Sequence, residues 1–224
     1  MEDRGGGVNW GLGRSAVNGN WWKLGRGKRV LLSLAIIASA FAGLNWSDRA
    51  RAEAPEVSGP PIEYDHLSSE KAEPYGSRGA PPQRPEEKRA VRRFADVRDC
   101  LVRVEQEKDI PDLRKINWQM MTSTANIRVC MFRIFASYGT PEKAVLWLEA
   151  QGLTATGPTD STYAFKPTIN VSGRHAPTED GLLYVSGSRI TDRLAAKFIY
   201  SETFGASWDE NGVLTTTFHS QSSK

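Results

Sequence analysis

The sequence predicts an α+β fold, in which about three helices are followed by an antiparallel β-meander of about four strands. Two observations carry this prediction. Between residues 86 and 152, apolar side chains recur at steps of three and four, as in helices that pack on one side. Beyond Gly157 the period falls to two, and residues 209–212 have the composition of a hairpin turn between two β-rich runs.

The first helix is expected to end near Lys108, just before Pro111. Its apolar stripe is formed by Val91, Phe94, Val97, Leu101 and Val104, with charged residues on the other faces.

The second and third helices are indicated by their ends as well as by their stripes. A stripe from Ile127 to Tyr138 stops at Gly139. Next, Thr140 is placed to cap a helix that has Pro141 at its first position and Gly152 as its stop.

Strands are expected over the remaining residues. One strand runs through Tyr163, Phe165, Ile169 and Val171, and Pro167 within it predicts an edge position or a bulge. A second strand is expected at 182–185, with a helical turn as an alternative for 191–196. A final hairpin joins 198–208 to 213–218.

The chain divides into three regions. Residues 1–52 read as a signal peptide or a signal anchor, because basic residues at 25–29 precede an apolar run at 30–44 and a small-residue cleavage site near Ala52. An uncleaved anchor would contact the membrane through residues 30–46. Residues 53–85 hold seven of the twelve prolines and read as a disordered linker with a reach of about 90 Å. Residues 86–224 form the exported domain.

The distribution of charge argues against nucleic acid as a partner. The chain has 29 Lys and Arg and 26 Asp and Glu, but 8 of the basic and 3 of the acidic residues fall within 1–52. The rest of the chain therefore carries a net charge of about −2, and the basic character belongs to the leader.

The two cysteines, Cys100 and Cys130, are expected to form a disulfide in an oxidising compartment. The alternative is two buried, reduced thiols. A bridge needs the helix that carries Cys130 to start near 122–124, since an earlier start would place the two cysteines too far apart along their helices.

Few residues suggest chemistry. His175 is the best candidate, in a loop with Glu179 and Asp180 that offers an imidazole near two carboxylates, although a solvated loop is the simpler interpretation. The only tryptophans of the exported part are candidates for a binding surface, with core packing as the alternative; they are Trp118, Trp147 and Trp208. No phosphate loop, zinc helix or nucleophile elbow occurs, and no metal or other cofactor is expected.

These observations favour an exported envelope protein, periplasmic or anchored in the inner membrane and facing the periplasm. Its small domain is expected to be non-catalytic and to bind an envelope protein or a wall polymer. An envelope hydrolase is the alternative, using acidic residues from a set that sequence spacing does not pair; the set is Glu149, Glu179, Asp180, Glu202 and Asp209. A homo-oligomer formed through an unpaired strand edge is a third possibility.

Overall fold

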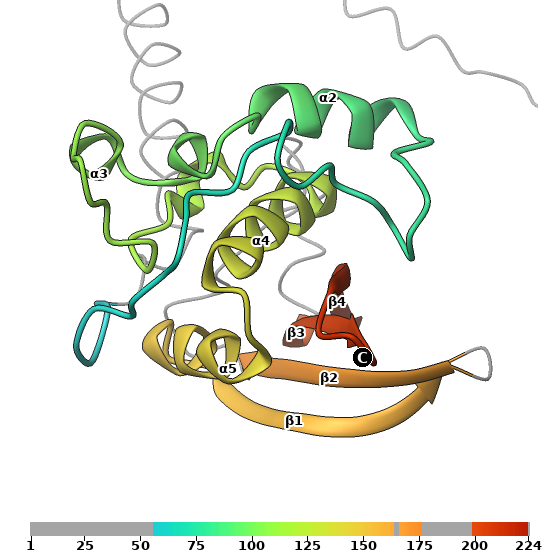
Figure 1. Cartoon of the computed structure of the whole chain (residues 1–224). Coiled ribbons are helices and arrows are strands. Elements are labelled where there is room, and N and C mark those ends of the chain that lie inside the picture. The colour runs from blue at the N-terminus through green and yellow to red at the C-terminus, as the bar shows by residue number, and fades with distance from the viewer. Residues whose placement is uncertain (1–55, 164–165, 176–198, 224) are drawn as a thin grey trace, which may run out of the picture. The chain divides into compact units, whose positions relative to one another are not determined.

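A helical layer covers one face of a four-stranded antiparallel sheet, which confirms the predicted α+β class (Figure 1). The computed structural model describes residues 56–163, 166–175 and 199–223. The strands are β1 (Thr154–Tyr163), β2 (Lys166–His175), β3 (Ile199–Asp209) and β4 (Leu214–Ser223), in the order β1-β2-β3-β4. Helices α4 (Thr124–Tyr138) and α5 (Pro141–Ala150) pack against the sheet, and α2 (Pro85–Arg93) packs on α4 on the side away from it (Figure 1).

Helices α4 and α5 begin and end where their capping residues predict. The Ser123 hydroxyl accepts the N–H of Asn126 at 3.2 Å and so caps the start of α4. The helix ends at Gly139, whose φ of 76° is readily available only to a residue without a Cβ. The Thr140 hydroxyl then accepts the N–H of Lys143 and caps α5, with Pro141 at its first position.

The first predicted helix is wrong in extent. The apolar stripe of residues 91–104 is divided among α2, a 3₁₀ turn η2 (Val97–Cys100) and the short helix α3 (Arg103–Gln106). The break occurs because the Asp96 side chain accepts the N–H of Arg98, while the Asp99 side chain accepts the N–H of Asp96. Val104 therefore leaves the stripe and is 70% exposed.

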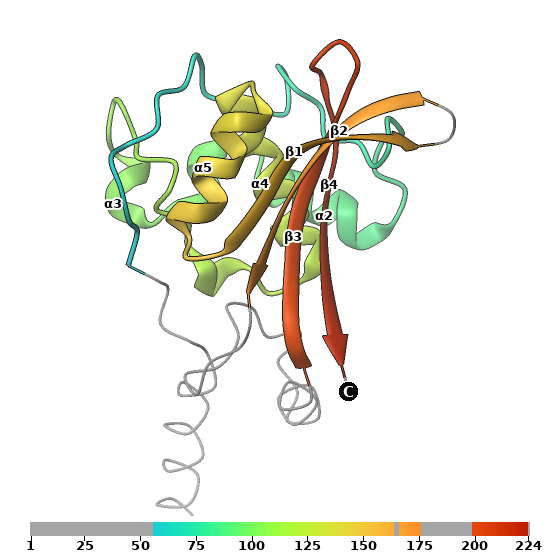
Figure 2. The same ribbon diagram turned by 90° about the horizontal axis from the view of Figure 1, so that it is seen from below.

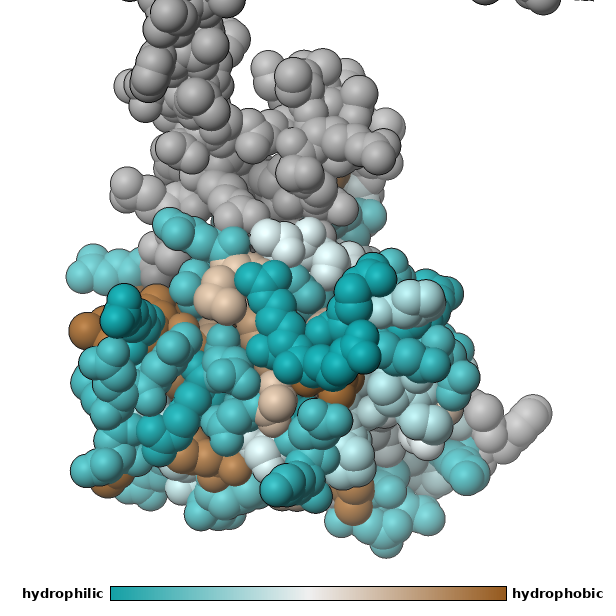
Figure 3. All heavy atoms as spheres, turned by 90° about the horizontal axis from the view of Figure 1, so that it is seen from above, coloured by the Kyte–Doolittle hydropathy of each residue, from teal (hydrophilic) through white to brown (hydrophobic). Residues whose placement is uncertain are grey.

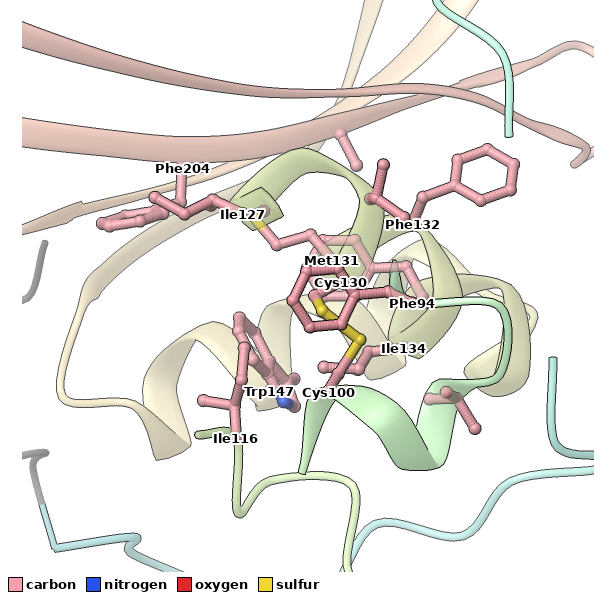
Figure 4. Packing of buried hydrophobic residues seen from close by; sticks show 14 of the residues in the cluster. Phe94, Cys100, Ile116, Ile127, Cys130, Met131, Phe132, Ile134, Trp147 and Phe204 are labelled. Atoms are coloured by element: carbon pink, nitrogen blue, oxygen red, sulfur yellow. A yellow bond between two sulfur atoms is a disulfide. The ribbon is translucent and has the colours of Figure 1, made fainter. Parts of the chain in front are cut away.

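The predicted disulfide is present. Cys100 in η2 and Cys130 in α4 are bonded with their Cα atoms 5.5 Å apart, and both are fully buried (Figure 4). The helix bearing Cys130 does start late, after a second 3₁₀ turn, η3 (Trp118–Met120). In Figure 4 the bridge lies among core side chains that include Phe94, Ile134 and Trp147.

The single broken strand predicted around Pro167 is in fact two strands. Tyr163 ends β1, and Pro167 is the second residue of β2, which lies inside the sheet and not at its edge. The proline is accommodated there because it stands at the start of the strand, where Thr162 is its partner. The predicted strand at 182–185 and the helical turn at 191–196 lie outside the described residues.

The final hairpin is confirmed. β3 and β4 are joined by residues 210–213, and the Asp209 carboxylate accepts the N–H groups of Asn211 and Val213, both at 2.9 Å. These hydrogen bonds explain Asp209 as a turn residue, so that carboxylate has a structural role.

Residues 56–84, here called the strap, pack against the helices and do not extend as a linker. Arg114 donates to the carbonyl oxygens of Ser58, Gly59 and Pro60, at 3.0, 2.6 and 2.7 Å. Further along the strap, Tyr75 is buried against Phe132, with the ring centroids 5.5 Å apart. The described part of the predicted linker therefore belongs to the folded domain. It is held mostly by hydrogen bonds to its backbone carbonyl oxygens.

The predicted leader lies outside the described residues. Within the ranges 56–163, 166–175 and 199–223, no helix is both long enough and apolar enough to cross a bilayer.

Candidate functional site

The three tryptophans proposed as binding aromatics are all in the core. Trp147 and Trp208 are fully buried and Trp118 is 5% exposed. The indole N–H of Trp118 donates to Gln151 at 3.1 Å, and that of Trp147 donates to the carbonyl oxygen of Leu113 at 3.0 Å. The three tryptophans therefore pack in the core, which was the alternative prediction, and they offer no exposed surface to a partner.

His175, the predicted site histidine, lies at the end of β2 and faces a glutamate on the next strand. Its direct cross-strand partner is Glu202 on β3, whose own partner on β4 is Gln221. Glu202 is fully buried, accepts a hydrogen bond from the Gln221 amide at 3.0 Å and lies 3.5 Å from Nε2 of His219. The predicted companions of His175, Glu179 and Asp180, lie outside the described residues.

This polar cluster, formed by His175, Glu202, His219 and Gln221, extends to the start of α4. The exposed hydroxyl of Thr124 lies 3.5 Å from Nδ1 of His219, so a hydroxyl, an imidazole and a carboxylate follow one another. Both distances exceed the 2.6–3.2 Å over which proton transfer is efficient. The Phe204 ring also packs on the imidazole, with the ring centroids 4.8 Å apart. At these distances the cluster is a set of polar side chains packed at one end of the sheet, without the spacing that proton transfer needs.

The two other acidic candidates that the structure describes, Glu149 and Asp209, do not belong to the cluster. Glu149 is exposed on α5, and Asp209 is used by the β3–β4 turn. In the part of the chain that the structure describes, no group of three or more His, Cys, Asp or Glu side chains is arranged to hold a metal ion.

A surface of consistent chemistry is the outer face of the sheet, the side turned away from α4 (Figure 2). Cross-strand pairing aligns its side chains in rows, because residues two apart on a strand share a face. The three rows that cross all four strands are Thr154, Arg174, Thr203 and Ser220; Thr156, Ser172, Gly205 and Phe218; and Thr159, Asn170, Ser207 and Thr216.

These twelve positions hold eight hydroxyl side chains, one amide and a single charged group, Arg174. Each hydroxyl can donate one hydrogen bond and accept others, so the face offers both roles at closely spaced points. Adjacent strands lie about 4.8 Å apart, which sets the spacing of the array across the sheet. The hydroxyl of Ser207 donates to the Asn170 side-chain oxygen at 2.5 Å, so two neighbours in the third row are already oriented by each other.

One aromatic ring lies within this array. Phe218 is 36% exposed, and its ring covers Gly205 on the neighbouring strand. A Cβ at position 205 would contact that ring and would lie 2.6 Å from the carbonyl oxygen of Val171, closer than real Cβ atoms approach. Glycine at 205 therefore lets the ring lie against the sheet instead of standing away from it.

Comparisons with protein families, curated proteins and solved structures found no match to this chain. The site is therefore argued from its own geometry.

The sequence does not indicate the outer face through an apolar alternation or a cluster of titratable residues, because hydroxyl side chains occupy most of its positions. A period of two is present in the face's hydroxyl residues, as in Thr154, Thr156 and, after the irregularity at 157–158, Thr159 and Ser161. This alternation of hydroxyl side chains is the feature of the sequence that indicates the outer face. Gly205 and Phe218, on strands that pair, add to it.

Proposed function

We propose that this chain is an exported protein of the cell envelope and that its α+β domain is a non-enzymatic module that binds a wall glycan through the outer face of the sheet. The observation that carries the proposal is the array of three cross-strand rows with eight hydroxyls and one charged group. A polymer of hydroxylated sugars presents the same two hydrogen-bonding roles, repeated along its length, and so complements such an array.

The aromatic ring supports the same class of ligand. The exposed side of Phe218 gives a flat apolar surface of the kind that packs against the C–H face of a sugar ring. Hydroxyls around an aromatic ring meet both the polar edge and the apolar face of a pyranose. A folded protein partner, in contrast, is usually bound through a patch with several large apolar or arginine side chains at its centre.

An open sheet face suits an extended polymer. Small ligands are generally enclosed in concave sites that bury most of their surface, whereas a strand of sugars can lie along a flat face and make many weak contacts. The sequence-based expectation of an exported domain places such polymers within its reach.

The test is binding of the protein, recovered from the envelope of an expressing host, to insoluble wall glycan in a sedimentation assay. Phe218→Ala is expected to weaken binding about tenfold, the equivalent of about 1.4 kcal/mol for a lost aromatic contact. The paired variant Thr156→Val and Thr159→Val should also weaken it. Thr162→Val is the matched control, because Thr162 is exposed on the same strand but alternates to the opposite side. Equal binding by all of these variants, or no binding by the unaltered protein, would reject the outer face as the site.

A second candidate, an envelope hydrolase, is favoured by the succession of Thr124, His219 and Glu202. An exposed hydroxyl at a helix N-terminus, followed by an imidazole and a buried carboxylate, has the order of groups found in nucleophilic hydrolases. Hydrolysis of a chromogenic acyl ester that is lost in Thr124→Val and in His219→Gln would support it. Absence of turnover by the folded, disulfide-bonded protein would dismiss it without affecting the glycan proposal.

A further inference from the structure

Helix α2 and its N-cap residue Arg84 present a strip of positive charge. The strip, here called the basic face, consists of exposed residues at spacings that place them on one side of the helix: Arg84, Lys88, Arg89, Arg92 and Arg93. Glu86 is the only exposed acidic residue of α2, and its carboxylate lies 3.9 Å from Arg84. Among the described residues, the other four cations of the face form no ion pair.

Elsewhere among the described residues, six Lys and Arg side chains form ion pairs with carboxylates. Buried Glu105 is met by Lys108 and Lys115, at 2.8 and 3.1 Å. Buried Glu87, on the inner side of α2, lies 3.3 Å from Arg128 of α4. Four cations without an ion pair among the described residues, Lys88, Arg89, Arg92 and Arg93, therefore lie together on one exposed helix side, although the chain beyond residue 52 is slightly acidic as a whole.

The basic face is held in a fixed orientation. Ala90 and Val91 are buried on the inner side of α2, and the ion pair between Glu87 and Arg128 ties the same side to α4. At the start of the helix the Glu87 carboxylate also accepts the backbone N–H of Arg84. Because the inner side is anchored, the outer side presents its cations together.

We propose that the basic face of α2 binds the phosphate headgroups of an anionic phospholipid membrane. A cluster of four to eight Lys and Arg side chains on an amphipathic helix is sufficient for such binding, at about a fivefold gain in affinity for each cation near the surface. A membrane is favoured over nucleic acid because the sequence predicts an exported domain. The inference is independent of the glycan proposal, which concerns different residues.

The position of α2 fits this role. The helix lies on the side of α4 away from the sheet (Figure 1), and on the face seen from that side strongly hydrophilic residues gather near the middle (Figure 3). A membrane against α2 would leave the outer face of the sheet directed away from the lipid. If the apolar run is retained as an anchor, twelve residue steps separate Trp46 from Ser58, the first of the described residues to be hydrogen-bonded to the domain. Twelve extended residues span at most about 40 Å.

The test compares acetylation of single lysines, measured by mass spectrometry, for the same envelope-purified protein on two kinds of vesicle. On vesicles with 30% phosphatidylglycerol, Lys88 should be modified about fivefold more slowly than on phosphatidylcholine alone. Lys143 and Lys166 should be modified at the same rate on both, since neither belongs to the basic face. High salt should remove the protection of Lys88.

A variant pair separates the basic face from general charge. Arg89→Gln with Arg92→Gln should abolish the protection of Lys88, whereas Lys71→Gln with Arg103→Gln, which removes the same charge elsewhere, should preserve it. All four side chains are exposed, so folding should be unaffected. Equal protection on both vesicles, equal effects of the two variants, or tighter binding to DNA than to anionic vesicles at physiological salt would each overturn the proposal.

Discussion

Replacement of Arg133 by methionine tests whether the strap is part of the folded domain. Arg133 is fully buried in α4, and its guanidinium donates to carbonyl oxygens of Phe94, Ser69 and Glu73. Burial lowers the pKa of this guanidinium, while the nearby carboxylates of Glu70 and Glu73 act to raise it. Methionine keeps most of the side-chain length but supplies no donor.

The magnitude follows from the acceptors that lose their donor. The carbonyl oxygen of Ser69 keeps a second hydrogen bond, from the N–H of Glu73 at 2.9 Å. The carbonyl oxygens of Phe94 and Glu73 lose the guanidinium, and each buried acceptor left without a partner costs about 1–3 kcal/mol. Relief of the buried charge offsets part of that cost, so we expect Arg133→Met to lower the free energy of unfolding by about 3 kcal/mol.

Two measurements check this. Chemical denaturation should give the loss of about 3 kcal/mol for Arg133→Met and a change within about 0.5 kcal/mol for the exposed control Arg92→Met. Hydrogen exchange should show protected amides at Ser68 and Glu70 in the unaltered protein, because they donate to Ser137 Oγ at 2.9 Å and to the carbonyl oxygen of Ala95 at 2.7 Å. If both amides exchange without protection in the unaltered protein, the strap is not part of the folded domain. Equal stability of Arg133→Met and Arg92→Met would contradict the prediction in the same way.

Three further predictions concern single features. Replacing both Cys100 and Cys130 by alanine should cost about 3.6 kcal/mol from the 30-residue loop alone, measured by denaturation against the oxidised protein; a loss below about 1 kcal/mol would contradict the loop-entropy argument. Gly205→Ala should destabilise the protein by more than 1 kcal/mol, and adding Phe218→Ala should not restore it, since the contact with the Val171 carbonyl oxygen stays; full rescue would mean that the ring alone requires glycine. Burial alone would raise the pKa of Glu105, but hydrogen bonds from Lys108, the Asp112 N–H and Lys115 outweigh it and lower that pKa to about 2. Because the folded pKa is depressed, the carboxylate contributes stability above about pH 4.5 that is lost as the pH falls toward 2, and Glu105→Gln should flatten that part of the stability curve.

The sequence predicts best where a single residue decides the local structure. Ser123, Thr140 and Gly139 act through their own backbone neighbours, so the ends of α4 and α5 follow from them directly. The predicted disulfide and the predicted late start of α4 depended on each other, because a bridge between Cys100 and Cys130 restricts where the helix that carries Cys130 can begin. The break after α2 was missed since the stripe of apolar residues continues through it, while the Asp96 and Asp99 side chains that interrupt the helix are polar.

The candidate sites were harder to predict because they depend on pairing between strands. Glu202 was named as one of five acidic residues, but its position beside His219 and His175 follows only from the register of β2, β3 and β4. Of β1, only its last residue, Tyr163, was predicted to lie in a strand. Many of the other positions hold hydroxyl residues and show no apolar alternation. Of the basic residues of α2, only Arg92 and Arg93 were expected on the polar faces of a helix. That Lys88, Arg89, Arg92 and Arg93 form no ion pair with a described carboxylate follows only from the positions of those carboxylates in the fold.

The way in which the strap is held has a consequence for how this protein can change over evolution. Arg114 and Arg133 contact the strap through six backbone carbonyl oxygens, and those atoms are present whatever side chain follows. Five of these oxygens belong to the strap itself, so most of its side chains are free to be exchanged while its path is kept. Relatives of this chain should therefore diverge rapidly across 56–84 and still retain both arginines. Conservation of Arg114 and Arg133 would then indicate that residues 56–84 are structured, although the sequence of that segment does not predict it.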